Sequence, residues 1–294
     1  MTSLISLLKT THKGPYPAIS PSRPELSQAG RTVLITGGST GVGFAIARGF
    51  AQASANRVII TGRRENVLDD AVEKLAHEFP TVQFIGKSLD VADLPSTNQL
   101  WADLLQQNIT VNVLVLNASS SSHCQPILEA GVDKIWRDFI VNARTLLAFT
   151  EKFYKQAPGQ KFLVNVSTMA IQDWNRVVPE MPGYGLTKST GTLLIQQIAK
   201  DSSPKDMQAL SFHPGSILTE TVKRVVGERH KGFQFDDENL AGHFAVWAAS
   251  PQAEFLHGRF VWTAWDVDEL KGGEIRKLID GEPYYLQIGV KGLT

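Results

Sequence analysis

A tyrosine and a lysine four residues apart, Tyr184 and Lys188 in the sequence YGLTK, could carry out acid–base chemistry together. At the start of a helix this spacing places both side chains on one face. A phenol has an unperturbed pKa of about 10, and a neighbouring ammonium favours the phenolate and lowers that pKa toward neutrality. The pair therefore predicts a general acid–base group, although an ordinary amphipathic helix start shows the same spacing.

A glycine-rich run, TGGSTGVG from Thr36 to Gly43, could bind an anion. It follows an apolar strand candidate at 32–35 and opens a helix candidate at 44–53. Glycines let the backbone approach a pyrophosphate closely, and the first helical N–H groups point at it. The residues expected to hold the pyrophosphate of a dinucleotide are Gly37, Ser39, Thr40, Gly41, Val42 and Gly43.

Strand and helix patterns alternate along the chain, as they do in a parallel sheet built from strand–helix–strand units. The predicted strands cover residues 33–36, 57–61, 82–85, 111–116, 161–166, 207–212 and 259–263. The predicted helices cover residues 44–53, 65–78, 93–107, 131–156, 184–200 and 238–250. The fold class that follows is α/β, a single Rossmann-like, doubly wound parallel β-sheet of about seven strands with helices on both faces. We expect this domain at 27–270, between an extended N-terminal arm at 1–26 and a C-terminal extension at 271–294.

The carboxyl ends of the strands meet along one edge of such a sheet, where ligands bind. A dinucleotide lying there would also touch the residues that follow the third and fourth strands, Asp90, Val91, Asn117 and Ala118. An acidic residue about 20 positions beyond the glycine turn would hold the ribose 2′-hydroxyl of NAD. Gly62 occupies that place instead, followed by Arg63 and Arg64. Guanidinium groups bind phosphate, which favours NADP(H) over NAD(H), unless the two arginines are only a solvated helix start.

The composition argues against several other classes of protein. The 294 residues carry 29 basic and 29 acidic side chains, so the net charge is zero and nucleic acid is not an expected partner. Cys124 is the only cysteine, which excludes an intramolecular disulfide and points to a cytoplasmic setting. The seven histidines lack metal-ligand spacing, so we expect no metal. No apolar run approaches the roughly 18 residues that span a bilayer, so we expect no membrane association.

Together these motifs resemble the short-chain dehydrogenase/reductase family over roughly residues 27–263. The segments that carry the resemblance are TGGSTGVG, Asp90-Val91, Asn117-Ala118, Asn142, NVST at 165–168, YGLTK, and HPGSILT at 213–219. The leader YPAISPSRPELS and the ending FVWTAWDVDEL at 260–270 further resemble filamentous-fungal members, which often act in secondary metabolism. The resemblance implies a homodimer or homotetramer that acts on a small-molecule carbonyl or alcohol.

The resemblance also implies a role for each residue of the site. Tyr184 would be the general acid in reduction, and Lys188 would bind the ribose hydroxyls and lower the tyrosine pKa. Asn142 would hold a water that links Lys188 to solvent, and a hydroxyl of the NVST segment would orient the substrate oxygen. The residues expected to flank the nicotinamide are Pro214, Gly215, Ile217 and Thr219.

Two positions depart from the family pattern. Ser119 stands where the family usually has the glycine of Asn-Ala-Gly. Alignment of the NVS segment places Thr168 at the catalytic hydroxyl position, with Ser167 as the alternative. Threonine keeps a donor and acceptor oxygen but adds a methyl group and restricts χ1.

The segment 169–183 joins the expected catalytic strand to the catalytic helix and should overhang the nicotinamide. Its apolar residues favour a bulky, apolar ketone as substrate, or else they pack into the core or a subunit contact. They are Met169, Ile171, Trp174, Val177, Val178 and Met181. The expected activity is NADPH-dependent reduction of a carbonyl to an alcohol, or the reverse. Two alternatives stay open: a non-redox cyclisation or elimination at the same site, and nucleotide sensing without turnover.

Overall fold

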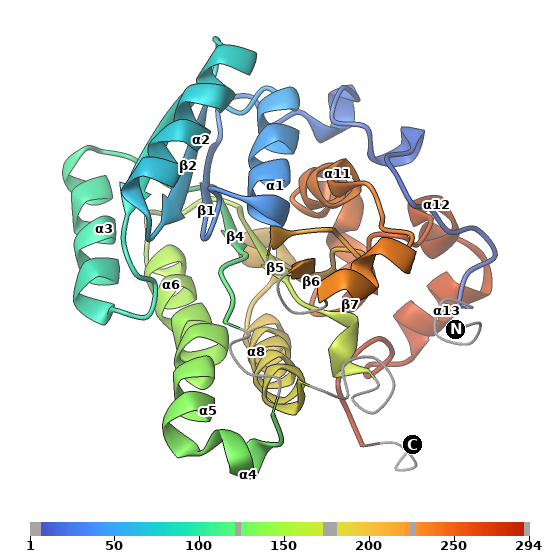
Figure 1. The fold of residues 1–294 in the computed structure, drawn as a ribbon. Coiled ribbons are helices and arrows are strands. Elements are labelled where there is room, and N and C mark those ends of the chain that lie inside the picture. The colour runs from blue at the N-terminus through green and yellow to red at the C-terminus, as the bar shows by residue number, and fades with distance from the viewer. Residues whose placement is uncertain (1–6, 121–124, 173–180, 221, 224–226, 291–294) are drawn as a thin grey trace.

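Seven strands form one parallel sheet in the order β3-β2-β1-β4-β5-β6-β7 (Figure 1). The structure, a computed structural model, describes residues 7–120, 125–172, 181–220, 222–223 and 227–290. The strands are β1 (Thr32–Ile35), β2 (Arg57–Gly62), β3 (Gln83–Ser88), β4 (Val113–Leu116), β5 (Lys161–Val166), β6 (Gln208–His213) and β7 (Phe260–Trp262). The predicted α/β, doubly wound fold is confirmed. The strand order reverses between β1 and β4, and sheets of this kind bind ligands beyond the carboxyl ends of the strands at that point.

Helices cover both faces of the sheet (Figure 1). One face carries α1 (Gly41–Gln52), α2 (Glu65–Glu78) and α11 (Glu238–Ala248). The other carries α3 (Leu94–Gln106), α6 (Thr145–Tyr154) and α8 (Pro182–Lys200). The other helices described are α4 (Ile127–Ala130), α5 (Val132–Phe139), α9 (Pro204–Met207), α12 (Val267–Lys271) and α13 (Gly273–Gly281). Short 3-10 helices lie at η1 (Pro17–Ile19), η2 (Pro24–Leu26), η4 (Met169–Ile171), η5 (Gly227–Gly232) and η6 (Pro251–Leu256).

Alternating side chains of the central strands build two separate cores. Val33 and Ile35 of β1 pack toward α1 and α11, whereas Leu34 packs toward α3 and α6. All of these side chains are fully buried. A strand covered on both faces needs apolar residues at every position, which explains the continuous apolar runs in the sequence.

The predicted helix over 131–156 contains an interruption. It consists of α5, a π-helical turn called η3 (Ile140–Arg144), and α6. A π turn adds a residue to the helix and is frequent at functional sites. Here the turn carries Asn142, whose main-chain oxygen packs so closely on α8 that a Cβ atom at Gly191 would lie 2.2 Å from it.

The N-terminal segment packs against the residues that follow β7, the last strand of the sheet. Tyr16 donates a hydrogen bond of 2.9 Å to the carbonyl of Trp265, and its ring stacks on His12 with centroids 3.7 Å apart. His12 in turn contacts the Asp266 carboxylate at 2.9 Å. The arm therefore adds contacts that join the two ends of the chain.

None of the helices in the described part of the chain combines the length and apolar character needed to cross a bilayer. Within the same residues, no group of three or more His, Cys, Asp and Glu side chains is arranged to hold a metal ion. Cys124 lies outside the described residues.

Candidate active site

The glycine turn between β1 and α1 forms a cradle that only glycine can build. Gly37 and Gly41 have φ values of +65° and +54°, in the left-handed region that disfavours side chains. A Cβ atom at Gly43 would lie 2.2 Å from the carbonyl oxygen of Gly37. The turn therefore folds back on the first turn of α1, and the first N–H groups of a helix, which have no partner within it, are the donors that a phosphate-binding turn uses.

Asn117 at the end of β4 fastens this turn. Its side-chain amide donates to the carbonyls of Thr36 and Gly37 at 3.0 and 2.9 Å. The Thr36 hydroxyl in turn accepts the backbone N–H groups of Asn117 and Ala118 at 2.9 and 3.0 Å. The sequence predicts that Asn117 and Ala118 contact the cofactor. In the structure, the side chain of Asn117 holds the backbone of the glycine turn in place.

The predicted adenosine side lies at the ends of β2 and β3. Arg63 and Arg64 are exposed where α2 begins. A Cβ atom at Gly62 would lie 3.0 Å from the Ser39 hydroxyl, so the missing side chain leaves room beside that hydroxyl. The carboxylate of Asp90 accepts the backbone N–H of Ala92 at 2.9 Å and so closes the loop after β3.

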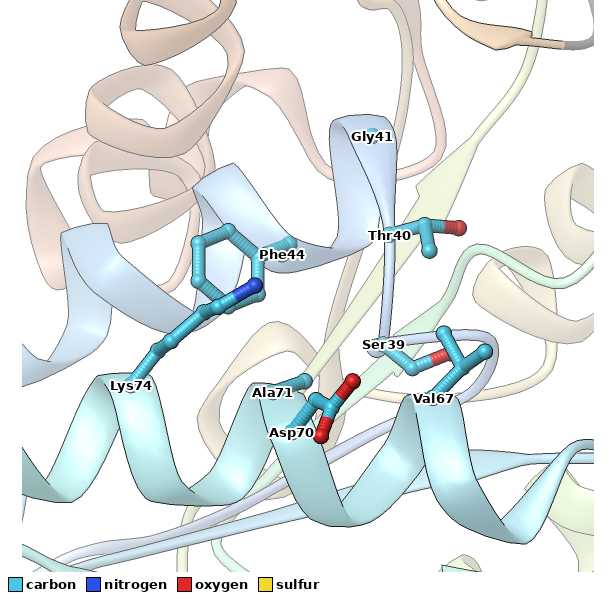
Figure 2. A pocket seen from close by; sticks show the side chains of 8 residues that line it. All are labelled: Ser39, Thr40, Gly41, Phe44, Val67, Asp70, Ala71 and Lys74. Atoms are coloured by element: carbon cyan, nitrogen blue, oxygen red, sulfur yellow. The ribbon is translucent and has the colours of Figure 1, made fainter.

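A pocket of about 260 Å³ opens between the start of α1 and one side of α2 (Figure 2). Ser39 and Thr40 of the glycine turn lie at one end of it, and Lys74 of α2 lies at the other beside Phe44. The remaining lining residues are Gly41, Val67, Asp70 and Ala71. The pocket thus lies between the glycine turn and α2.

Tyr184 lies in the first turn of α8, near the side-chain hydroxyls of Thr168 and Ser119. These hydroxyls lower the pKa of the phenol, but burial is the larger effect and raises it above its ordinary value. Ser167 faces a different way, because its hydroxyl lies 2.6 Å from the Thr192 hydroxyl inside the fold. The structure therefore brings Thr168, and not Ser167, to the tyrosine.

Lys188 is buried one helical turn after Tyr184, and its ammonium donates to the carbonyl of Val166 at 2.6 Å. Burial lowers the pKa of Lys188 to about 8, because a charged amine is disfavoured away from water. The sequence predicts that Lys188 lowers the tyrosine pKa. Desolvation acts on both groups, so the raised pKa of Tyr184 differs from that expectation.

Asn142 uses its side-chain amide to hold the loop that follows β4. Its oxygen accepts from the Ser120 backbone N–H at 2.9 Å and from the Ser119 hydroxyl at 3.2 Å. Its nitrogen donates to the Ser120 carbonyl at 2.8 Å and to the Thr187 hydroxyl at 2.9 Å. The amide thus joins η3, the loop after β4 and α8 around the tyrosine.

The segment after β6 returns to the glycine turn. The methyl group of Thr219 would lie 3.0 Å from a Cβ atom at Gly41. Gly215 has a φ of +96° and follows Pro214, while Ile217 is buried. The Asp236 carboxylate accepts the backbone N–H of Ser216 at 2.7 Å and fixes this turn. Sequence reasoning missed Asp236, since no motif distinguishes it from other loop carboxylates.

The described apolar residues of the segment expected above the nicotinamide pack into the protein interior. Met169 and Ile171 pack against the hydrophobic core, as the core alternative expects. Met181 is buried at the start of α8, whereas Trp174, Val177 and Val178 lie outside the described residues. Trp262 lies beside this segment, because its indole N–H donates to Gln172 at 2.8 Å.

The fold and the site are those of an α/β protein with a glycine-rich turn and a tyrosine–lysine pair beyond the carboxyl ends of its parallel strands. The family model for short chain dehydrogenases matches residues 31–230. The chain belongs to this family, which confirms the resemblance read from its motifs.

Curated relatives from filamentous fungi match nearly the whole chain. The short chain dehydrogenase/reductase AacuD of Aspergillus aculeatus is 30% identical over 96% of this chain and 95% of its own length. The short chain dehydrogenase/reductase nsrO of Aspergillus novofumigatus is 34% identical over 89% of each chain.

Solved structures share the fold at lower identity. A 7α-hydroxysteroid dehydrogenase complexed with NADH and 7-oxo glycochenodeoxycholic acid superposes with a TM-score of 0.74, at 19% identity, over 85% of this chain and 97% of that one. The L-sorbose reductase of Gluconobacter frateurii, complexed with NADPH and L-sorbose, gives a TM-score of 0.71 at 21% identity, over 81% of this chain and 96% of that one.

Proposed function

We propose that the protein is an NADPH-dependent carbonyl reductase, or the reverse alcohol dehydrogenase, acting on a bulky, apolar substrate. The observation that carries the proposal is the position of the Tyr184 phenol near the Thr168 hydroxyl, one helical turn before the buried Lys188. Membership of the family supports an oxidoreductase, and the fungal relatives favour a role in secondary metabolism.

The residues present fit a dinucleotide, because the cradle at Gly43 has no room for a side chain and leads into the first N–H groups of a helix. The residues that would hold the cofactor are Gly37, Ser39, Thr40, Gly41, Val42, Gly43, Arg63, Arg64, Asp90, Val91, Asn117, Ala118, Tyr184, Lys188, Pro214, Gly215, Ile217 and Thr219. When bound, the nicotinamide supplies or accepts the hydride.

Side chains of the protein transfer the proton and orient the substrate. Thr168 donates a hydrogen bond to the carbonyl oxygen, and Tyr184 gives that oxygen its proton as charge develops there. Lys188 turns from the Val166 carbonyl toward the ribose and, as a cation, favours the phenolate left on the tyrosine. Asn142 holds α8 against the loop after β4, so that these groups keep their mutual geometry.

A panel of aromatic and alicyclic ketones mixed with the protein and NADPH tests this function, with loss of reduced nicotinamide absorbance as the readout. We expect oxidation of NADPH with some of these ketones, and none with Tyr184→Phe, which should retain nearly unchanged affinity for the cofactor. Product formation without consumption of NADPH would replace the proposal with a non-redox reaction. Tight NADPH binding with no product from any ketone would favour a sensing protein.

The preference for NADP(H) rests on Arg63 and Arg64, which are exposed beside Gly62 and the Ser39 hydroxyl. Arg63→Glu should raise the KM for NADPH at least tenfold while changing the KM for NADH far less, because it sets a carboxylate against the 2′-phosphate. The matched control is Lys277→Glu on α13, an equal change of charge on an exposed helix, which should alter neither value. Equal increases for both cofactors would count against the assignment.

We further propose a cytoplasmic homodimer or homotetramer. The single cysteine supports the location. Large apolar side chains exposed on α4 and α5 support the assembly: Leu128, Val132 and Trp136 are 94%, 76% and 62% exposed. Large apolar side chains gathered on an exposed surface favour association with another molecule.

A further inference from the structure

The segment that joins β6 to α11 is closed at its base by two hydrogen bonds. The Ser216 N–H donates to the Asp236 carboxylate at 2.7 Å, and the Asp236 N–H donates to the Ser216 carbonyl at 2.9 Å. The same carboxylate lies against Gly215, where a Cβ atom would be 2.8 Å from its oxygen. The place of Asp236 therefore determines the place of the turn at 214–216.

The residue that follows, Asp237, is held by the N-terminal arm. Its N–H donates to the carbonyl of Lys13 at 2.7 Å. A Cβ atom at Gly14 would lie 3.6 Å from the Cβ of Asp237, so the two backbones run close together. The ammonium group of Lys13 also donates to the side-chain oxygen of Gln234. The arm thus contacts the base of the segment through main chain and side chain.

The arm is fixed at its other side to residues that follow β7. The His12 N–H donates to the carbonyl of Ala264 at 2.7 Å. The N–H groups of Lys9 and Thr10 donate to the carboxylate of Glu269, at 2.9 and 3.0 Å. The arm therefore connects the chain after β7 to the base of the segment between β6 and α11.

The held segment also reaches the glycine turn. The methyl group of Thr219 would lie 3.0 Å from a Cβ atom at Gly41, where α1 begins. We propose that Lys13 is a positioning residue, which acts through Asp237 and Asp236 to hold the turn at 214–216 in place for catalysis. This inference rests on the proposed function, which puts that turn beside the nicotinamide.

The first test removes one hydrogen bond between the arm and the segment. Asp237 has a φ of −69°, which proline adopts, so Asp237→Pro removes the N–H that donates to Lys13 without a change of φ. The substitution also removes the carboxylate, which caps α11 by accepting the Asn239 N–H at 2.8 Å. Asp237→Ala is the matched control, because it loses the same carboxylate and keeps its own N–H.

The kinetics should divide between kcat and the two KM values. Relative to Asp237→Ala, Asp237→Pro should lower kcat about tenfold and raise the KM for the ketone about fivefold, because the turn at 214–216 loses its fixed place. The KM for NADPH should stay within about twofold, because the glycine turn and the adenosine side are unchanged. Equal kinetics of the two variants, or a fall in kcat alone as partial unfolding would give, would overturn the inference.

The second test attaches the arm covalently. The Cβ separation of 3.6 Å between positions 14 and 237 suits a disulfide. In a Cys124→Ser background, Gly14→Cys together with Asp237→Cys supplies the only two thiols of the chain. We expect the disulfide to form and the oxidised protein to keep the kcat and ketone KM of the wild type. Loss of turnover on oxidation, regained on reduction, would show that the arm must leave the segment during catalysis and would overturn the proposal.

Limited trypsin digestion needs neither substrate nor turnover. Lys223 and Lys231 are exposed cleavage sites within the segment. Cleavage after them should be faster in Asp237→Pro than in Asp237→Ala, and slower in the oxidised disulfide variant than in its reduced form. If cleavage changes in this way while the wild type reduces no ketone, the proposed function fails and the hold of the arm on the segment stands. If the wild type reduces ketones and neither cleavage nor kinetics change, the role of Lys13 fails alone.

Discussion

At the scale of single residues, the site depends on which hydroxyl faces the tyrosine. Two adjacent residues at the end of β5 carry hydroxyl groups, and strand geometry sends them to opposite sides. Ser167 pairs with Thr192 inside the fold, whereas Thr168 lies near Tyr184. The assignment of Thr168 as the orienting hydroxyl remains a prediction. It predicts very different kcat values for variants of Thr168 and of Ser167.

Thr168→Val should lower kcat about a hundredfold, because valine keeps the shape but removes a donor aimed at the carbonyl oxygen. Ser167→Ala should leave kcat within about twofold and cost only about 1 kcal/mol of unfolding free energy, from the lost bond to Thr192. Steady-state kinetics and urea unfolding of both variants check this. A large loss of turnover in Ser167→Ala with an active Thr168→Val would reverse the assignment.

Burial of the charged Lys188 amine should lower the free energy of unfolding of the protein when it is studied without cofactor. Its pKa is lowered to about 8 in the folded chain, so the unfolded chain binds more protons between that pH and its ordinary value, and stability rises with pH across this window. Lys188→Met removes the buried charge and should raise the unfolding free energy at pH 7 by about 2 kcal/mol while abolishing turnover.

Urea unfolding at pH 7 and pH 10 checks the sign for Lys188. The advantage of Lys188→Met should shrink at the higher pH, where the wild-type lysine is already neutral in the fold. If the stability advantage of Lys188→Met grows with pH, the pKa of Lys188 in the folded protein is raised and not lowered.

At the scale of elements, two helices meet at glycines and hold the glycine turn in place. A Cβ atom at Gly242 of α11 would lie 2.4 Å from the Ala45 oxygen of α1, and one at Gly49 would lie 2.6 Å from the Gly242 oxygen. The α1 helix begins with the cradle, so its position on the sheet depends on this close approach. The alternation of strands and helices predicted both elements, but their contact brings together distant parts of the sequence.

Gly242→Ala should destabilise the protein by about 2–3 kcal/mol, because the added methyl group collides with backbone that cannot move aside. The matched control is Gly281→Ala at the end of α13, where a Cβ atom would meet nothing within 4 Å. That control should be neutral or slightly stabilising. Thermal unfolding of both variants is the measurement, and equal stability of the two would contradict this account of the packing.

At the scale of the whole molecule, α4 and α5 expose large apolar side chains to solvent. Trp136 is 62% exposed and packs beside Phe139 with ring centroids 5.7 Å apart. The N-terminal arm covers a different part of the surface, near α12, through Tyr16 and His12. A second copy of the chain is therefore our proposed covering for α5.

Trp136→Glu should convert the oligomer to monomer, measured by light scattering, since a carboxylate at the centre of an apolar contact loses its hydration. Leu105→Glu on α3 is the control, because Leu105 is 78% exposed on another helix and should leave the mass unchanged. A wild-type protein that is already monomeric would refute the assembly.

The alternation of strand and helix patterns along the sequence determined the fold class, and spacings within a few residues determined the glycine turn and the Tyr184–Lys188 pair. The bounds of some strands differ from the prediction: β3 runs on through Lys87 and Ser88, which lack an apolar pattern, whereas β4 and β7 are shorter than predicted. The family followed from the same motifs, and the comparison confirmed it.

Only the tertiary structure decided how the site is connected. The position of Tyr184 near Thr168 and Ser119, the amide of Asn142 on two neighbouring segments, and the lowered pKa of Lys188 all depend on groups from separate strands and helices. Burial and hydrogen-bond direction are properties of a folded neighbourhood, and no spacing along the chain encodes them. Ser119 is recognisable in the sequence as a departure from the glycine of the family pattern. Its position near the tyrosine depends on the fold, which brings β4, η3 and α8 together.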